Sequence, residues 1–148
     1  MSETNALGVD ATSSGRSIPR SILAVFVGLV VIFIAHAGTD AIMHGTGVFP
    51  PVGQPMANRL WLLAFTYRAV TSVLGCYVTA LLAPNRPVRH GLILGWIGVV
   101  LSLGGAIAFW NQGSGFGPKW YPISLVIVAL PCAWLGGKLR ELQLQARN

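Results

Sequence analysis

The chain has 148 residues, of which 53% are hydrophobic and only 9% are charged, and its mean hydropathy is +0.65. About a quarter of the residues of an ordinary soluble domain are charged, so this composition excludes that class. The formal net charge of +6 does not indicate nucleic-acid binding, because the basic residues lie in small groups at the ends of apolar runs rather than along one face. We therefore expect a single domain whose partner is the lipid bilayer.

Four apolar segments follow one another along the chain, and each is near the length of about 20 residues that crosses about 30 Å of hydrocarbon. Residues 1–20 precede them and are rich in Ser, Thr, Asn and Gly, which predicts a flexible tail. The predicted domain covers 21–140, and a short second tail covers 141–148. Its spans are expected at about 21–43, 60–83, 91–110 and 121–137.

The distribution of Lys and Arg predicts the orientation of these spans, because short basic loops are poorly translocated and remain in the cytoplasm. One side of the predicted bundle holds only Arg59 and Lys119. The other side holds seven basic residues: Arg16, Arg20, Arg86, Arg89, Lys138, Arg140 and Arg147. Trp61, Trp110 and Trp120 mark the outer boundary, where amphipathic rings prefer to lie. We expect an all-α integral membrane four-helix bundle, N-in/C-in, with both tails in the cytoplasm.

The first apolar segment also permits a second interpretation. Arg16 and Arg20, the apolar run 22–35 and the small-x-small triplet at 35–37 resemble a signal peptide with its cleavage site. Against this interpretation, the apolar stretch resumes at 41–43 and becomes long enough to span, and cleavage would leave an odd number of spans. We keep the segment as the first span, and its cleavage stays open.

Two charged residues fall inside predicted spans. Asp40 lies close to the outer end of the first span, and Arg68 lies deeper, in the second. A charge within a membrane is costly and usually faces the bundle interior with a partner. No other Asp or Glu occurs between Asp40 and Glu141, and Glu141 belongs to the inner side, so a carboxylate that pairs with Arg68 must be Asp40. We predict a buried Asp40/Arg68 pair near the outer face.

Helical spacing places further polar groups beside this pair. Residues three and four apart share one face of a helix, so we expect a polar pocket formed by His36, Asp40, His44, Tyr67 and Arg68. Small and polar residues form a stripe on each of the next two spans: Ala64, Arg68, Thr71, Ser72, Gly75 and Thr79 on the second, and Gly91, Gly95, Gly98, Ser102 and Gly105 on the third. Because small residues let helices approach closely in lipid, these faces of the first three spans are expected to converge.

Three roles for the polar groups stay open. In the structural role, one hydrogen-bonded ion pair, completed by His36 or Tyr67, pins the first span to the second and contributes about 1 kcal/mol or less. In the transport role, His36, Asp40 and Arg68 handle protons or anions in a small transporter or channel-like pathway. In the third role His36, Asp40 and His44 bind a metal ion, although His36 and His44 lie two helical turns apart and cannot easily grip one ion.

The sequence contains no catalytic constellation. It has three histidines, one carboxylate in the membrane and no serine motif of the nucleophile-elbow type. We therefore expect no enzyme activity, no catalytic residue and no cofactor. Cys76 and Cys132 fall inside apolar runs, where they act as small apolar residues. His90 follows Arg86 and Arg89 in the inner connection, where a solvated charge cluster is expected.

Short motifs spread along the chain resemble an uncharacterised family of small four-span bacterial membrane proteins. They are Gly38-Thr39-Asp40, Phe49-Pro50-Pro51, Tyr67-Arg68, Trp110-Asn111, Phe116-Gly117-Pro118, Trp120-Tyr121-Pro122 and Gly136-Gly137-Lys138-Leu139. The resemblance implies a bacterial cytoplasmic (inner) membrane and a four-span fold over about 21–140. It implies no activity, cofactor or partner.

These observations favour a non-enzymatic membrane subunit, or a binding protein with a buried Asp40/Arg68 pair near the outer face. The alternatives are the small transporter and the metal-binding membrane protein. Four spans seldom enclose a pathway alone, so transport would require an oligomer. A homo-oligomer or a membrane-protein partner is compatible with either role, and no nucleic-acid partner is expected.

Overall fold

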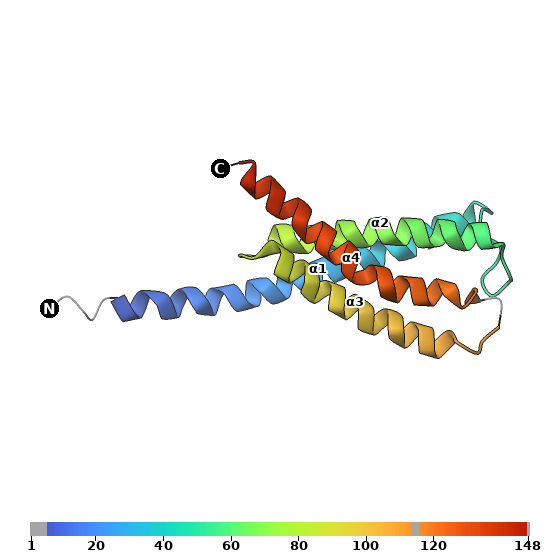
Figure 1. Cartoon of the computed structure of the whole chain (residues 1–148), viewed down its shortest axis with the longest axis horizontal. Helices are drawn as coiled ribbons and strands as arrows, with labels where there is room; N and C mark the ends of the chain where they lie inside the picture. Colours follow the sequence, from blue (N-terminus) through green and yellow to red (C-terminus); the bar gives the residue numbers. More distant parts are fainter. Residues whose placement is uncertain (1–5, 114–115, 148) are drawn as a thin grey trace.

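Four helices form the protein: α1 (Ala6–Gly45), α2 (Asn58–Leu82), α3 (Pro87–Phe109) and α4 (Trp120–Gln145) (Figure 1). The structure is a computed structural model and describes residues 6–113 and 116–147, and no strand occurs in these ranges. All four helices are long and apolar enough to cross a membrane, α1 from Ile18 onward. The prediction of an all-α fold with four membrane-compatible helices is therefore confirmed.

The outer helices are longer than the predicted spans. Helix α1 begins at Ala6 and α4 continues to Gln145, so the segments predicted as tails over 1–20 and 141–148 are largely helical where they are described; residues 1–5 and 148 lie outside the described part. Hydropathy indicates where a membrane span ends, but the end of a helix depends on capping residues and helix-breaking residues. Beyond the last apolar residues, Glu, Leu and Gln are good helix formers. Both extensions project from the same end of the molecule (Figure 1).

The bundle has small residues inside and large apolar residues outside. Ala24, Ala80 and Ala133 are buried, whereas Phe33 is 72% exposed and Ile107 is 71% exposed. Lipid tails are as apolar as a Leu side chain, so a large apolar side chain gains little by moving from lipid into the bundle interior. Close packing between small residues holds the helices together instead. The distribution of side chains is therefore that of a membrane protein.

Glycines bring α1, α2 and α4 into close contact near the end of the bundle that carries the chain termini, called here the terminal end. A Cβ atom at Gly28 of α1 would lie 2.8 Å from the backbone oxygen of Gly75 in α2. A Cβ atom at Gly136 of α4 would lie 2.6 Å from the backbone oxygen of Val73 and 2.7 Å from the backbone nitrogen of Tyr77. No larger residue fits at these crossings without moving backbone.

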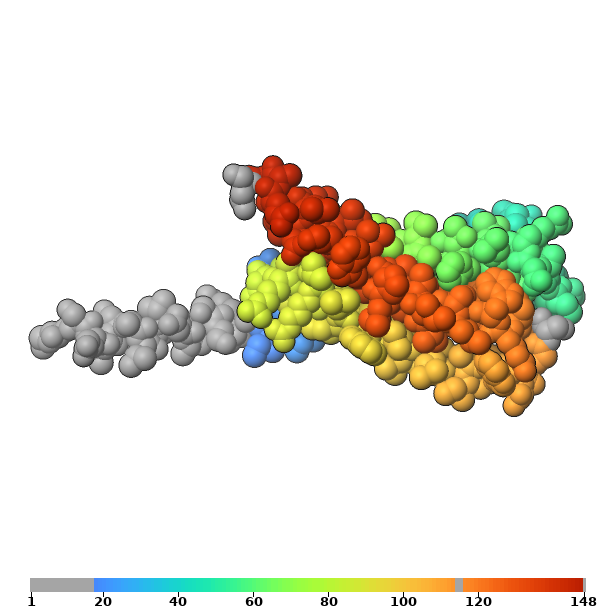
Figure 2. Space-filling model, in the orientation of Figure 1, coloured from blue at the N-terminus to red at the C-terminus, as the bar shows by residue number. Residues whose placement is uncertain are grey.

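Helix α3 makes its closest contact with α4, which lies across α2 and α3 on the face shown in Figure 2. A Cβ atom at Gly91 would lie 2.9 Å from the backbone oxygen of Ala133, and one at Gly137 would lie 2.7 Å from the Cα atom of Val88. Contact between α1 and α3 is slight. The prediction that the glycine face of the third span packs against the first two spans is thus wrong at this end, because α4 takes that face.

The opposite end, which carries the α1–α2 and α3–α4 connections and is called here the loop end, is more open. A Cβ atom at Gly98 would meet only the Cβ atom of Ala129, at 3.9 Å, and one at Gly104 or Gly105 would meet nothing within 4 Å. Helices α3 and α4 separate toward this end (Figure 1). The bundle is therefore tight at its terminal end and splayed at its loop end.

The environment of His90 differs from the predicted one. Its side chain is only 6% exposed, and its Nε2 atom lies 2.9 Å from the hydroxyl oxygen of Ser21 in α1. The expected solvated charge cluster is therefore wrong for His90, although Arg86 and Arg89 are exposed. The reason is tertiary: α1 crosses the first turn of α3 at this point and covers the imidazole.

Candidate functional site

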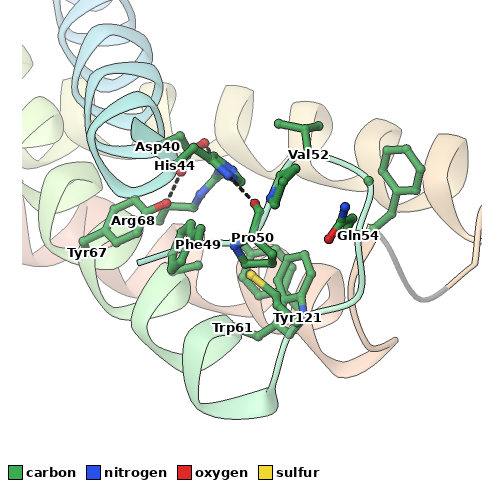
Figure 3. Close-up of a pocket in the computed structure, with 15 residues that line it drawn as sticks. Asp40, His44, Phe49, Pro50, Val52, Gln54, Trp61, Tyr67, Arg68 and Tyr121 are labelled. Carbon is green, nitrogen blue, oxygen red and sulfur yellow. Dashed lines mark hydrogen bonds and ion pairs between the residues drawn. The ribbon is translucent and has the colours of Figure 1, made fainter. Parts of the chain in front are cut away.

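The two charges predicted inside the membrane form an ion pair. Nη2 of Arg68 in α2 donates to Oδ2 of Asp40 in α1, and the hydroxyl of Tyr67 donates to Oδ1 of the same carboxylate (Figure 3). The two charged side chains are 27% and 31% exposed, so the predicted pair forms but is only partly buried. Both carboxylate oxygens therefore have a donor, and the pair links α1 to α2 within the splayed half of the bundle.

His36 joins this group through the backbone rather than through the carboxylate. Its Nε2 atom lies 3.2 Å from the backbone oxygen of Arg68. A carbonyl oxygen only accepts hydrogen bonds, so Nε2 is the nitrogen that carries the proton in this contact. The same carbonyl also accepts from the hydroxyl of Thr71, at 3.2 Å. His36 therefore holds α1 against α2 one helical turn from the ion pair, on the side nearer the terminal end.

His44 lies on the other side of the ion pair and contacts the loop. Its Nδ1 atom donates to the backbone oxygen of Pro50 over 2.7 Å, and its ring meets that of Phe49 edge-on with 5.5 Å between centroids. Figure 3 shows the imidazole turned toward this loop. His36 and His44 thus have different partners, and they do not point into one common metal site.

A pocket of about 230 Å³, called here the outer pocket because it lies at the loop end of the bundle, is found between the ion pair and the loop after α1. Asp40, His44, Tyr67 and Arg68, four of the five residues predicted for the polar pocket, line it together with loop and aromatic residues: Phe49, Pro50, Gln54, Trp61 and Tyr121 (Figure 3). The Trp61 and Tyr121 rings pack at 4.8 Å between centroids. Sequence reasoning assigned Trp61 to the membrane boundary, and no local signal places it opposite an aromatic residue of another helix.

A second space, the bundle cavity, lies deeper among all four helices and measures about 360 Å³. Its polar lining consists of His36, Asp40, Arg68, Ser72 and Ser102. The remaining wall is mostly apolar and includes Leu29, Ile32, Phe33, Leu94, Leu101, Leu125 and Val128. Polar residues of the first three spans do converge here, although α4 supplies part of the wall.

Arg68 borders a third space as well, a cleft of about 320 Å³ between the splayed parts of α3 and α4. Tyr121 lines this cleft and the outer pocket, whereas Ser102 lines the cleft and the bundle cavity. The guanidinium therefore stands where three spaces meet, and Asp40 is common to two of them.

The electrostatics of the site are those of a neutral, incompletely satisfied pair. Asp40 and Arg68 cancel each other in charge, and neither oxygen of Asp40 lacks a donor. The Nε atom of Arg68, in contrast, is buried and has no hydrogen-bond partner within the part of the chain that the structure describes. An unpaired buried donor costs about 1–3 kcal/mol, so the Arg68 side of the ion pair is incompletely satisfied.

Possible metal ligands are dispersed. Within residues 6–113 and 116–147, no three side chains of His, Cys, Asp or Glu gather closely enough to hold an ion. Cys76 and Cys132 are buried free thiols, and Cys76 lines the bundle cavity. The predicted trio of His36, Asp40 and His44 is divided between the two sides of the ion pair, so the described geometry does not favour a metal site.

No protein-family model, curated protein or solved structure matches this chain. The class that its own residues define is a four-helix protein with membrane-compatible helices and a neutral ion pair bordered by cavities.

Proposed function

We propose that this chain is a non-enzymatic binding protein of a bacterial cytoplasmic membrane, with four spans and both termini in the cytoplasm. On this proposal the Asp40/Arg68 pair lies near the outer face, and the bundle cavity holds a small lipid-soluble molecule. The seven-to-two distribution of basic residues supports the orientation. The resemblance of the short motifs supports the bacterial location.

The bundle cavity is the observation that carries the proposed function. Its volume of about 360 Å³ falls in the range of roughly 300–1,000 Å³ typical of small-molecule sites. Like such sites, it has a largely apolar wall and a few convergent polar groups.

A purely structural role for the ion pair does not explain the spaces that surround it. The glycine crossings already hold the helices together at the terminal end, where backbones are in direct contact. An ion pair whose only role is to add stability gains from close packing around it, because low water access strengthens its attraction. Here three spaces border Arg68 instead.

The test uses a photoreactive probe, a ten-carbon methyl ketone with a diazirine in its chain, bound to the protein in lipid nanodiscs. In the variant Gly98→Leu the new side chain occupies the cavity, whereas in the matched variant Gly104→Leu it points to open space on the same helix. We expect cavity residues to be labelled in wild type and Gly104→Leu and labelling to fall at least fivefold in Gly98→Leu. Equal labelling of both variants would refute the proposed function.

A transport pathway is the second candidate, and one observation favours it. Asp40 and Arg68 line both the outer pocket and the bundle cavity, so the ion pair is common to two spaces between which a substrate could pass. Proteoliposomes would then show movement of protons or anions that depends on pH and is lost in Asp40→Asn. Transport that is indifferent to Asp40→Asn would exclude a relay through this carboxylate.

A further inference from the structure

The cleft between the splayed parts of α3 and α4 (Figure 1) differs from the other two spaces in the charges that line it. Arg68 and Lys119 border the cleft, and no carboxylate is among its lining residues. Asp40, which compensates Arg68, lines the outer pocket and the bundle cavity but not the cleft. The cleft therefore lies on the basic side of the ion pair.

Lys119 is the basic group that a ligand can reach. It is an exposed residue directly before α4, and its Nζ atom lies 5.1 Å from the centroid of the Trp110 ring, directly after α3. The sequence has no Asp or Glu over 41–140, and Asp40 pairs with Arg68. No carboxylate at the loop end remains to pair with Lys119, so its positive charge is available to an anion.

The remaining wall of the cleft is suited to a hydrocarbon chain. Its apolar lining comes from α3 and α4 and includes Leu101, Gly105, Ala106, Phe109 and Leu125. Leu101 is 58% exposed and Phe109 is 49% exposed, so the cleft adjoins the outer surface of the bundle. At roughly 30 Å³ for each water-sized group, its volume of about 320 Å³ accommodates a chain of about ten carbons.

The basic end of the cleft is at the level of a lipid head group. Trp110 and Lys119 lie where α3 and α4 end at the loop end of the bundle. Tryptophan prefers the membrane interface, and a basic residue near the membrane surface attracts anionic lipids. An acid head group at this level stays in contact with water, so it avoids most of the desolvation cost that an anion deep in the bundle would bear.

We propose that the cleft binds an anionic lipid, with its acid head group at Lys119 and an acyl chain between α3 and α4. A free fatty acid and an anionic phospholipid share this chemistry, and the experiment separates the two sources. The proposal rests on the membrane location proposed above, but it does not depend on what the bundle cavity binds.

The experiment compares three probes with the same diazirine-bearing acyl chain in nanodiscs: a fatty acid, a phosphatidylglycerol and a phosphatidylcholine. Mildly alkaline pH keeps the fatty acid ionised. Labelling of Leu101, Phe109 and Leu125 is divided by labelling of Ile34, which is 63% exposed on α1 and lies outside the cleft. We expect a ratio about fivefold higher for an anionic probe than for phosphatidylcholine, which corresponds to about 1 kcal/mol.

The anionic probe that gives the higher ratio identifies the source of the ligand. A higher ratio for the fatty acid assigns the cleft to a free carboxylate, and a higher ratio for phosphatidylglycerol assigns it to a phospholipid. Equal ratios for all three probes would overturn the anionic lipid.

A pair of variants tests the assigned head-group site. Lys119→Gln removes the charge at the cleft, and Arg59→Gln removes a charge at the same end of the bundle, in the first turn of α2 and outside the cleft. In Lys119→Gln we expect the ratio for the anionic probe to fall to that of phosphatidylcholine, whereas Arg59→Gln retains the difference. An advantage that survives in Lys119→Gln, or an equal loss in both variants, would refute Lys119 as the head-group site.

A second pair of variants tests the position of the chain. In Gly105→Phe the new ring occupies the cleft, whereas in Gly104→Phe it points to open space on the same helix. An added Cβ atom meets nothing within 4 Å at either position, so we expect both variants to fold. Labelling of Leu125 by the anionic probe is expected to fall at least fivefold in Gly105→Phe only. Equal labelling of the two variants would place the chain outside the cleft and overturn the proposal.

The cleft site and the proposed function fail in different ways. Equal ratios for the three probes, in a chain that enters nanodiscs, refute the cleft site alone. Equal ketone labelling of Gly98→Leu and Gly104→Leu refutes the function of the bundle cavity alone. A chain that does not enter nanodiscs refutes the membrane location, and both sites with it.

Discussion

Asp40 illustrates how one residue can be satisfied while its partner is not. Its two oxygens accept from Tyr67 and Arg68, whereas the Nε–H group of Arg68 has no acceptor among the described residues. A carboxylate has two oxygens to satisfy, but a guanidinium has five N–H donors in a fixed planar arrangement. A single carboxylate cannot satisfy all five, which leaves the buried Nε–H group without a partner among the described residues.

The coupling between Asp40 and Arg68 is measurable by a double-mutant cycle with Asp40→Asn and Arg68→Gln. Each single variant leaves one charged or polar group without its partner, so we expect a loss of about 1–3 kcal/mol in unfolding free energy. The double variant is expected to lose less than the sum, by about 1 kcal/mol. Unfolding in mixed micelles, followed by circular dichroism during an SDS titration, measures these values.

The control for this cycle is the pair of Lys138 and Glu141 on the last turns of α4. Its side chains are 36% and 35% exposed, and the two residues are three apart on one helix. Pairs of this kind contribute at most about 0.5 kcal/mol. A coupling between Asp40 and Arg68 no larger than that of the control pair would contradict their assignment as a connection between α1 and α2.

Tyr67→Phe removes the second donor to Asp40 and keeps the ring. We expect a loss of about 1 kcal/mol in unfolding free energy, since a partly buried carboxylate loses one of its two hydrogen bonds. Tyr77→Phe is the matched control, because its hydroxyl donates to Gln143 over 2.8 Å at the surface, where water replaces the protein partner. Equal losses in the two variants would show that the Tyr67 hydroxyl has no special role at the carboxylate.

At the scale of the helices, glycine position determines where the bundle is tight and where it is open. Gly28, Gly75 and Gly136 lie at crossings where an added Cβ atom would approach backbone within 3.0 Å. Gly104 and Gly105 face open space near the loop end of α3. The same residue type therefore serves close packing at one end of the bundle and leaves room at the other.

Gly136→Ala tests the tight crossing of α4 with α2. The new methyl group would collide with backbone atoms of Val73 and Tyr77, which cannot rotate away as a side chain can. We expect a loss of about 1–3 kcal/mol in unfolding free energy, typical of overpacking. Gly104→Ala, whose methyl group meets nothing within 4 Å, is expected to be neutral or slightly stabilising. Comparable stability of both variants in the same SDS titration would contradict the close crossing.

At the scale of the whole molecule, both chain termini lie at the same end of the bundle, as expected when four consecutive helices run alternately up and down (Figure 1). The loop end carries Arg59 and Lys119, whereas the basic residues of the terminal end include Arg20, Arg86 and Arg89. A charge asymmetry of this kind orients a bundle in its membrane.

Reporter fusions test the proposed orientation in a bacterial host. Green fluorescent protein fused after Asn148 is expected to fluoresce and alkaline phosphatase at that position to be inactive, because both report a cytoplasmic C-terminus. Phosphatase inserted in the loop after α1, at Val52, is expected to be active. An active phosphatase after Asn148 would reverse the orientation. The mass of the purified chain checks the first span, since cleavage near 37 would remove about a quarter of the 15.7 kDa.

The candidate site was predictable in part. The ion pair followed from elimination, because Asp40 is the only carboxylate that the sequence places near Arg68. The assignment of His44 to the same face was correct along the helix but missed its loop partner, Pro50, whose position depends on how the chain turns back after α1. Burial of His90 was missed because α1 covers it, which no pattern within α3 reveals.

The sequence by itself determined the number of helices, their approximate spans and the position of two charges among apolar residues, because hydropathy and charge are properties of each segment alone. Only the tertiary structure decided that α4 takes the glycine face of α3, that the loop end is splayed, and that cavities border Arg68. Those features depend on distances between backbones far apart in the chain. A glycine permits close approach, but its partner across the bundle decides whether that approach occurs.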